Sequence, residues 1–369
     1  MKAPIPFVDF GASVRGLRPE LDAAVARVLD SGHFILGPEG EALERELAAD
    51  FGVPAAVLVG NGTEAIQLAL EALGIGPGDE VVTTPLTAAF TGIAIRRAGA
   101  TPVFADVDPV TLCISPAAAR AAITNRTRAI VPVHLYGHPA DLDALAALAK
   151  ETGVALLEDA CQAHGARHRG RPVGSFGAAA ALSFYPTKNL GALGDGGAVL
   201  VGDPSLEAKL RRLRNGGQSD RYRHEEVGLN SRLDEIQAAL LRVKRRHLPE
   251  WTRRRRELAA LYARALAGVP VTLPAAGEGS VHHLFPIRHT ARDEIQERLR
   301  ADGVGTLIHY PIPLHLQPAF ADLGGRVGDL PAAERAAREL LSLPLYPELG
   351  DDRVQLVVEA VRRAVTAVS

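Results

Sequence analysis

The chain has 369 residues, of which 47% are hydrophobic and 23% charged, and a formal net charge of -2. This composition is typical of an ordinary globular protein and lacks the positive charge that nucleic-acid binding needs. No apolar run reaches membrane-spanning length and the start lacks the apolar core of a signal peptide, so we expect a cytoplasmic protein without a membrane partner. The length exceeds what one core usually supports, so we expect one large and one small domain.

Strands and helices alternate along the first half of the chain. After helices at 17–29 and 38–51, the pattern predicts strands at 55–59, 81–84, 101–105, 128–133 and 154–157, with helices at 64–73, 88–97, 116–123 and 142–150. Alternation of this kind implies an α/β fold, with a mostly parallel sheet flanked by helices and joined by right-handed crossovers.

The second half changes character near residue 245. A strand at 179–184 and a helix at 204–214 precede a polar loop, and helical spacing then runs from 231 to 266 with a break at Pro249. We expect a large domain at 1–245 and a smaller C-terminal α/β domain at 246–369. The smaller domain is predicted to contain a strand at 283–288, an extended segment at 305–313, and helices at 291–301, 332–341 and 352–365.

The stretch from Val154 to Val201 organises the rest of the chain. Its first apolar run ends in Glu158 and Asp159, and ligands of α/β sheets gather beyond the carboxyl ends of strands. A second strand leads to Lys188 in a turn. Pyridoxal phosphate (PLP) requires a lysine amine and a carboxylate at its pyridine nitrogen, so this pair suggests PLP chemistry. The alternative is that Asp159 caps a helix and Lys188 is a solvated lysine.

A glycine-rich turn, Gly60-Asn61-Gly62-Thr63, follows the strand at 55–59 and leads into a helix. Free N–H groups and the helix dipole make such a helix start suitable for a phosphate. A simple cap by Asn61 or Thr63 explains the turn equally well.

No metal site is predicted. His134 and His138 lie four residues apart, but the prolines and glycine around them exclude the helix that would pair them. The two cysteines, Cys113 and Cys161, form neither a disulfide framework nor a zinc spacing.

Two further groups could line a ligand site. Gln162 and His164 follow Asp159 closely enough to reach the edge of a cofactor, although a histidine in the core is the default for His164. The rigid, aromatic segment from Tyr310 to His315 could line a pocket or merely connect two elements.

Together these stretches resemble the DegT/StrS-type family of sugar-nucleotide aminotransferases, which are PLP enzymes of fold type I with an aspartate aminotransferase-like fold. The matching pieces follow the family's order over nearly the whole chain: GNGTEAIQLAL, GDEVVTTP, ADVDP, PVHLYGHPADLDAL, EDACQAHGA, SFYPTKNLGALGDGGAV, LRNGG, GLNSRLDEIQAALLRVK, HHLFPIR and HYPIPLHLQ. The lysine segment and GLNSRLDEIQAA are the most specific.

The resemblance implies roles for individual residues. Lys188 matches the catalytic Schiff-base lysine, Asp159 the partner of the pyridine nitrogen, and Gln162 the residue beside the ring hydroxyl. The family's ligands of the cofactor phosphate correspond to Gly62, Thr63 and Ser183. Asn230 corresponds to an asparagine that the family contributes from the neighbouring subunit. The resemblance therefore implies a homodimer with shared active sites.

The resemblance also implies a reaction. L-glutamate would convert PLP to pyridoxamine phosphate, which would then aminate a nucleotide-linked ketosugar. Phe184-Tyr185-Pro186-Thr187-Lys188 resembles the 3-ketosugar branch, so the expected substrate is a dTDP-3-keto-6-deoxyhexose, with Tyr185, Tyr310 and His315 near the sugar. The alternatives are a 4-ketosugar or cyclitol aminotransferase, or a non-catalytic regulator with a PLP fold; a dehydrase of this fold would have histidine in place of Lys188.

One segment departs from the family pattern. The family usually stacks an aromatic residue on the cofactor ring from a P-x-x-T-(aromatic)-x-A-T segment, but Ala88 occupies that position here and Phe90 lies two residues later. Either Phe90 stacks from a shifted register or the ring is covered in another way.

Overall fold

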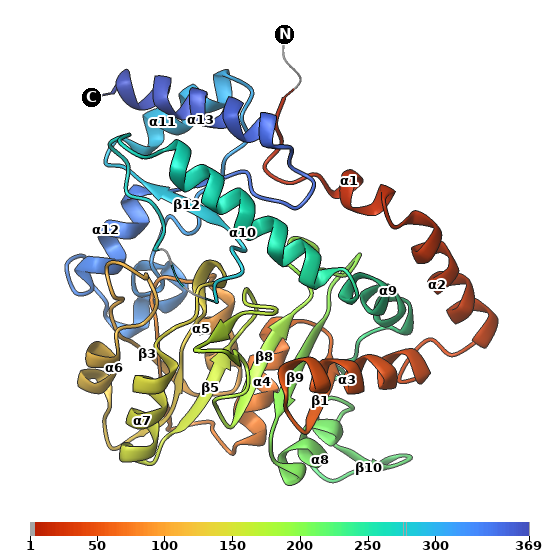
Figure 1. The fold of residues 1–369 in the computed structure, drawn as a ribbon. Helices are drawn as coiled ribbons and strands as arrows, with labels where there is room; N and C mark the ends of the chain where they lie inside the picture. Colours follow the sequence, from red (N-terminus) through yellow and green to blue (C-terminus); the bar gives the residue numbers. More distant parts are fainter. Residues whose placement is uncertain (1–3, 276, 278, 369) are drawn as a thin grey trace.

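A central sheet of seven strands forms the large part of the protein in the computed structural model, which describes residues 4–275, 277 and 279–368 (Figure 1). The strand order is β1-β9-β8-β5-β4-β2-β3. The bounds are β1 Ala55–Val59, β2 Glu80–Thr83, β3 Thr101–Phe104, β4 Thr127–Val131, β5 Ala155–Asp159, β8 Ala179–Ser183 and β9 Gly197–Val201. Strand β9 runs opposite to the other six strands of this sheet, so the prediction of a mostly parallel sheet is confirmed.

Helices cover both faces of this sheet. Side chains of β1, β2, β4, β5, β8 and β9 alternate between two buried clusters, one under α3, α6, α7 and α9 and the other under α4, α5 and α8, whereas the edge strand β3 packs Val103 against the first. The bounds are α2 Arg18–Ser31, α3 Pro38–Phe51, α4 Gly62–Ala72, α5 Phe90–Arg97, α6 Pro116–Ala122, α7 Leu142–Thr152, α8 Pro204–Leu213 and α9 Glu235–Arg245, with a short α1 at Phe10–Arg15 before them. Most predicted helices lie within a few residues of these bounds.

Local sequence explains where several of these helices begin and end. Proline occupies the first turn of α3, α6 and α8, where its missing N–H costs nothing. Asn61, Ser115 and Asp141 cap α4, α6 and α7 with side-chain oxygens. Gly52 ends α3 in the left-handed conformation, which glycine adopts without strain.

The C-terminal part is built on the two-stranded antiparallel sheet of β12 (Phe285–Arg288) and β13 (Leu340–Leu343). Helices α10 (Leu248–Ala265), α11 (Arg292–Ala301) and α13 (Asp351–Thr366) share a separate hydrophobic cluster with these strands. In Figure 1 the long α10 runs from α9 across to this part. Ile5 belongs to the same cluster and pairs with Val304, so this residue near the start of the described chain packs on the C-terminal part. The division at 245/246 stays a prediction.

Two segments differ from the predicted pattern. The helix expected at 332–341 is α12, Pro331–Glu339, and the next residues form β13, because the fully buried run Leu340–Leu343 pairs with β12. A short apolar run cannot be assigned to helix or strand from periodicity alone. The expected polar loop at 215–230 contains a small hairpin of β10 (Gln218–Asp220) and β11 (Arg223–His224).

The remaining elements are short. They are the hairpin of β6 (Arg167–His168) and β7 (Arg171–Pro172) and the 3-10 turns η1 (Leu135–Gly137), η2 (Leu314–Leu316) and η3 (Pro318–Leu323). The N-terminus of α12 is capped by the large part of the molecule, since Asp106 accepts from the N–H groups of Ala332 (3.0 Å) and Ala333 (2.9 Å). This contact helps fix the two parts against each other beside the carboxyl ends of the strands.

Candidate active site

Asp159 lies at the carboxyl end of β5, buried on the face that α4 and α5 cover. Its Oδ2 accepts a hydrogen bond from Thr91 Oγ1 at 2.8 Å, and its Oδ1 accepts from the Cys161 N–H at 3.2 Å. These two bonds fix the orientation of the carboxylate. They leave lone pairs on both oxygens free, because a carboxylate offers about four acceptor positions.

Lys188 enters the same region from the loop that follows β8. Its backbone N–H bonds to the Tyr185 carbonyl at 2.8 Å, which closes a tight turn. Burial lowers the pKa of Lys188, although the charges of Cys161 and Asp159 act in the opposite direction. A lysine with a lowered pKa has a larger neutral fraction, and only the neutral amine can act as nucleophile or base.

The start of α4 lies beside Ser183, at the end of β8. A Cβ on Gly62 would come within 2.7 Å of the Ser183 Cβ and 2.9 Å of the Cys161 Sγ, so only glycine fits there. The Asn61 side chain accepts from the Glu64 N–H at 2.9 Å, which confirms the cap considered as an alternative. The cap leaves the N–H groups of Gly62 and Thr63 without an acceptor inside the helix, so the cap and an anion site are compatible.

Gln162 is held by both ends of its amide. Its Oε1 accepts from the Tyr136 N–H at 2.7 Å, and its Nε2 donates to Tyr310 Oη at 3.1 Å. Burial raises the pKa of Tyr310 to about 12, and the nearby Asp159 adds to this effect, so the phenol stays protonated at neutral pH. The Tyr136 hydroxyl in turn donates to the His309 carbonyl, which ties the 309–310 segment to the large part of the molecule.

Three histidines close enough to feel the charge of Lys188 stay neutral. Burial and, to a smaller extent, the charge of Lys188 lower the pKa of His164 to about 3 and that of His309 to about 4. The pKa of His283 lies well below its usual value for the same two reasons. Both ring nitrogens of His164 are buried and have no hydrogen-bond partner among the described residues.

The other predicted residues lie in different surroundings. Tyr185 and Asn230 are exposed. His315 is buried and its Nε2 lies 3.2 Å from Glu334 Oε1, so a carboxylate already occupies one side of its ring. Phe90 is 62% exposed at the start of α5, whereas Thr91 on the next position reaches Asp159.

Sequence reasoning missed three residues that these contacts single out: Thr91 bonds to Asp159, Tyr136 bonds to Gln162, and the charge of Lys188 lowers the pKa of His283. The only available signal was their position inside matching stretches, since a hydrogen bond between distant segments leaves no local pattern.

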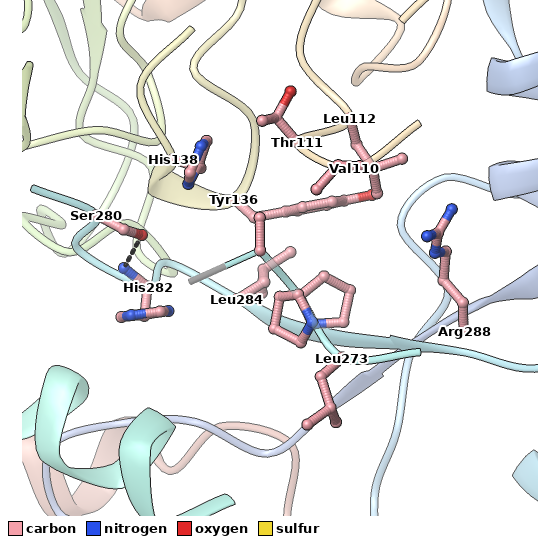
Figure 2. A pocket seen from close by; sticks show the side chains of 13 residues that line it. Val110, Thr111, Leu112, Tyr136, His138, Leu273, Ser280, His282, Leu284 and Arg288 are labelled. Atoms are coloured by element: carbon pink, nitrogen blue, oxygen red, sulfur yellow. Dashed lines mark hydrogen bonds between the residues drawn. The ribbon is translucent and has the colours of Figure 1, made fainter. Parts of the chain in front are cut away.

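A narrow pocket beside Tyr136 is lined by residues 110–112 and by residues of the stretches 273–275 and 280–288 (Figure 2). Its cavity volume of about 30 Å³ is far below the size of a ligand site.

No helix among the described residues is long and apolar enough to cross a membrane. Within the same residues, no group of three or more His, Cys, Asp and Glu side chains could hold a metal ion.

The strand ends thus present the three features that PLP needs. They are a carboxylate with free lone pairs (Asp159), a lysine with a lowered pKa (Lys188) and a glycine-lined helix start for a phosphate (Gly62). The buried, unpartnered ring of His164 shows in addition that this region contains polar groups not satisfied by the protein alone. The residues present therefore fit the cofactor.

Comparison with known proteins agrees with this geometry. Residues 16–362 match the model of the DegT/DnrJ/EryC1/StrS aminotransferase family. A dTDP-3-amino-3,4,6-trideoxy-alpha-D-glucose transaminase from Streptomyces venezuelae is 51% identical over 361 residues, which cover 97% of this chain and 95% of the relative.

Two solved structures are similar along almost the whole chain. S. venezuelae DesV in complex with a ketimine intermediate superimposes with a TM-score of 0.97 at 50% identity, covering 99% of each chain. NtdA from Bacillus subtilis, with the bound cofactor pyridoxamine phosphate, superimposes with a TM-score of 0.94 at 31% identity, covering 99% of this chain and 86% of that one.

Proposed function

Because the chain belongs to the DegT/DnrJ/EryC1/StrS aminotransferase family, we propose that it moves an amino group from L-glutamate to C3 of a dTDP-linked 3-keto-6-deoxyhexose. The protein is a transaminase and its cofactor is PLP, as in the similar structure that carries the pyridoxamine form. One observation carries the choice of sugar and carbon: the 51% identity, over 97% of the chain, to a transaminase of a dTDP-linked 3-amino sugar.

Lys188 performs the proton transfer in this proposal. Bound PLP supplies an electron sink that stabilises the charge left when a Cα proton is removed. The Nζ of Lys188 takes that proton from Cα and returns it to C4′ of the cofactor, acting first as base and then as acid. The burial that lowers the pKa of Lys188 increases the neutral fraction of its amine, which the role as base requires.

Asp159 holds the protonated ring nitrogen of the cofactor. Its carboxylate is oriented by Thr91 and by the Cys161 N–H, so the oxygens cannot turn away from the ring. A negative charge at this point favours the protonated ring, which is the better electron sink. Gln162, linked to Tyr310, lies at the ring hydroxyl in this proposal.

The phosphate of the cofactor occupies the start of α4. The N–H groups of Gly62 and Thr63 and the hydroxyl of Ser183 are its proposed ligands. The close packing of Gly62 against Ser183 supports this assignment, because it brings the helix start and the hydroxyl together.

The sugar lies between Tyr185 and the Tyr310–His315 segment in this proposal. Tyr185 is exposed next to the lysine turn, where an incoming substrate can reach it. The Tyr310 phenol is held by Gln162 and stays protonated, so it can donate a hydrogen bond to a sugar oxygen. The role of His315 rests on the family resemblance, since its ring is bonded to Glu334.

A homodimer completes the site in this proposal, with Asn230 reaching the cofactor of the partner. Apolar side chains are exposed in the 34–36 segment, which is joined to the 230–235 region by the Glu235 N–H bond to the Phe34 carbonyl (2.9 Å). Val227, close to Asn230, is 96% exposed. Exposed apolar residues gathered in one region are typical of an interface between subunits.

The test is a pair of half-reactions followed by absorption. Purified protein with PLP should show a visible band that bleaches when L-glutamate is added, and a dTDP-3-keto-6-deoxyhexose should restore it. The Lys188→Ala variant should bind PLP without completing either half-reaction. NMR of the product decides the carbon, and nitrogen at C4 would contradict the proposal. A band that ignores glutamate would favour the regulator, and restoration only by a UDP-linked sugar would correct the nucleotide.

A further inference from the structure

Asn189, the residue after the lysine, is bound at both ends of its amide. Its side chain is buried, with Nδ2 donating to the Val281 carbonyl at 3.1 Å and Oδ1 lying 3.2 Å from His283 Nδ1. A carbonyl only accepts, so the NH2 end must face Val281 and the oxygen must face His283. His283 therefore carries its proton on Nδ1 and donates it to Asn189. The lysine turn is thus joined at two points to a segment 92 residues away.

The segment that receives Asn189 is itself firmly attached. The Val281 N–H donates to the Gly137 carbonyl at 3.0 Å and the His283 N–H donates to the Tyr136 carbonyl at 2.8 Å. At Gly137, where φ is +83°, a Cβ would lie 2.7 Å from Val281 Cγ2 and 2.9 Å from the His283 nitrogen. This close approach leaves the 281–283 segment little room to shift.

The attachment continues to the cofactor side of the site. The Tyr136 N–H donates to Gln162 Oε1 at 2.7 Å, and Gln162 bonds to Tyr310. The path from Asn189 through 281–283 and 136–137 to Gln162 consists of buried hydrogen bonds. It connects the backbone that carries Lys188 with the residue proposed at the ring hydroxyl.

We propose that Asn189 is a positioning residue, which clamps the lysine turn to the 281–283 segment and so sets the direction from which Lys188 reaches the cofactor. The inference rests on the proposed function, in which the Nζ of Lys188 moves the Cα proton. A lysine side chain has four rotatable bonds, so its tip is placed only as well as its backbone is held. A displacement of about 1 Å at a reacting group can cost about 100-fold in rate.

The same segment provides a matched control. The Val281 carbonyl and the His283 ring take part in the clamp, whereas Ser280, His282 and Leu284 line the pocket beside Tyr136 (Figure 2). The Ser280 hydroxyl donates to the Gly137 carbonyl at 3.2 Å and accepts from the His282 N–H at 3.3 Å, so Ser280→Ala removes two hydrogen bonds of the same segment without touching Asn189. Asn189→Ala removes the two bonds of the clamp.

The experiment compares these variants as holoenzymes in a single turnover with L-glutamate. Asn189→Ala should slow bleaching of the visible band about 10- to 100-fold at saturating glutamate, with the half-saturating glutamate concentration changed less than about threefold. It should also shift the pH midpoint of the visible band, because the lysine amine has moved relative to Asp159. Ser280→Ala should match the wild-type protein in both measurements.

Two results would overturn the inference: a wild-type rate and pH midpoint in Asn189→Ala, or equal losses in Asn189→Ala and Ser280→Ala. Should Asn189→Ala fail to fold, His283→Ala decides, because it removes one of the two bonds of the clamp. It should give a smaller loss of bleaching rate and a shift of the pH midpoint in the same direction. Wild-type values in His283→Ala would then reject the clamp. A wild-type protein without a band, or with one that ignores glutamate, would instead refute the proposed function.

Discussion

The two faces of strand β5 place two neighbouring carboxylates in surroundings that differ in the number of hydrogen-bond donors. On one side, Glu158 is fully buried and accepts from the N–H groups of Gly174 (2.7 Å), Phe176 (2.7 Å) and Gly177 (3.0 Å). His134 Nε2 lies 3.2 Å away and donates, because its Nδ1 accepts from the Ala140 N–H. Burial alone would raise the pKa of Glu158, but His134 and these N–H groups outweigh it and lower the pKa.

On the other side, Asp159 receives one hydrogen bond on each oxygen. The two histidines differ in the same way, since both ring nitrogens of His134 are bonded and neither ring nitrogen of His164 is bonded among the described residues. A saturated carboxylate stabilises the loops around it, whereas an oriented but unsaturated one can bind a ligand. The burial of a charged group therefore does not by itself mark a site; its unused bonding capacity does.

The largest effect is expected from Asp159→Asn. The amide keeps the shape but loses the charge that we propose holds a proton on the cofactor ring, so kcat/KM should fall about 10³-fold, or about 4 kcal/mol. The unfolding midpoint of the protein without cofactor should change little, because only two hydrogen bonds are affected. Steady-state kinetics and thermal unfolding measure the two effects. A large loss of stability with an unchanged kcat/KM would contradict this prediction and show that Asp159 has the structural role assigned to Glu158.

Glu158→Gln is the matched substitution on the saturated side. One oxygen becomes an NH2 group facing N–H donors, so buried donors lose their acceptor and the free energy of unfolding should fall by about 3 kcal/mol. Urea unfolding measures this change. The kcat of the remaining folded enzyme should stay within about threefold of the wild-type value, as expected for a change away from the reacting groups. A loss of kcat as large as that of Asp159→Asn would show that both carboxylates serve the reaction.

The unsaturated His164 should make stability depend on pH. Its pKa is about 3 in the folded protein, below the usual value of 6.5. The unfolded chain therefore binds the proton first as pH falls, so this contribution is complete above pH 6.5 and is lost progressively toward pH 3. Between about pH 7.5 and about pH 5 the wild-type protein should lose about 2 kcal/mol more than His164→Leu. Parallel urea titrations at the two pH values test this, and identical losses would contradict it.

The smallest effect is expected from Thr91→Val, which removes the hydroxyl donor to Asp159 and keeps the carboxylate. The lost hydrogen bond to Asp159, about 1 kcal/mol, should lower kcat/KM about 5- to 10-fold, and the 3.2 Å bond between Thr91 Oγ1 and Thr87 Oγ1 is lost with it. Thr83→Val is the control, because that buried hydroxyl donates to the Val131 carbonyl at 2.8 Å, within the sheet. Equal kinetic losses in the two variants would mean that Thr91 acts through packing alone.

The sequence by itself predicted most of the elements and the two central residues of the proposed site. Strand β1 and helix α3 have the predicted bounds, because apolar runs, prolines and glycines act within a few neighbouring residues. The positions of Asp159 after an apolar run and of Lys188 in a turn are local features of the same kind. The family resemblance then named their chemistry, and the comparison with known proteins confirmed the family, the fold class and the cofactor.

Only the tertiary structure decided which partners these residues have. Thr91 lies 68 positions from Asp159, and Asn189 lies 94 positions from His283, yet each pair is joined by a hydrogen bond. The division between Glu158 and Asp159 is also tertiary, since adjacent carboxylates are indistinguishable until the strand places them on opposite faces. Strand β13 was missed for the same reason, because its pairing with β12 decides between helix and strand. Local patterns arise from interactions between near neighbours, whereas these contacts exist only after distant segments have packed together.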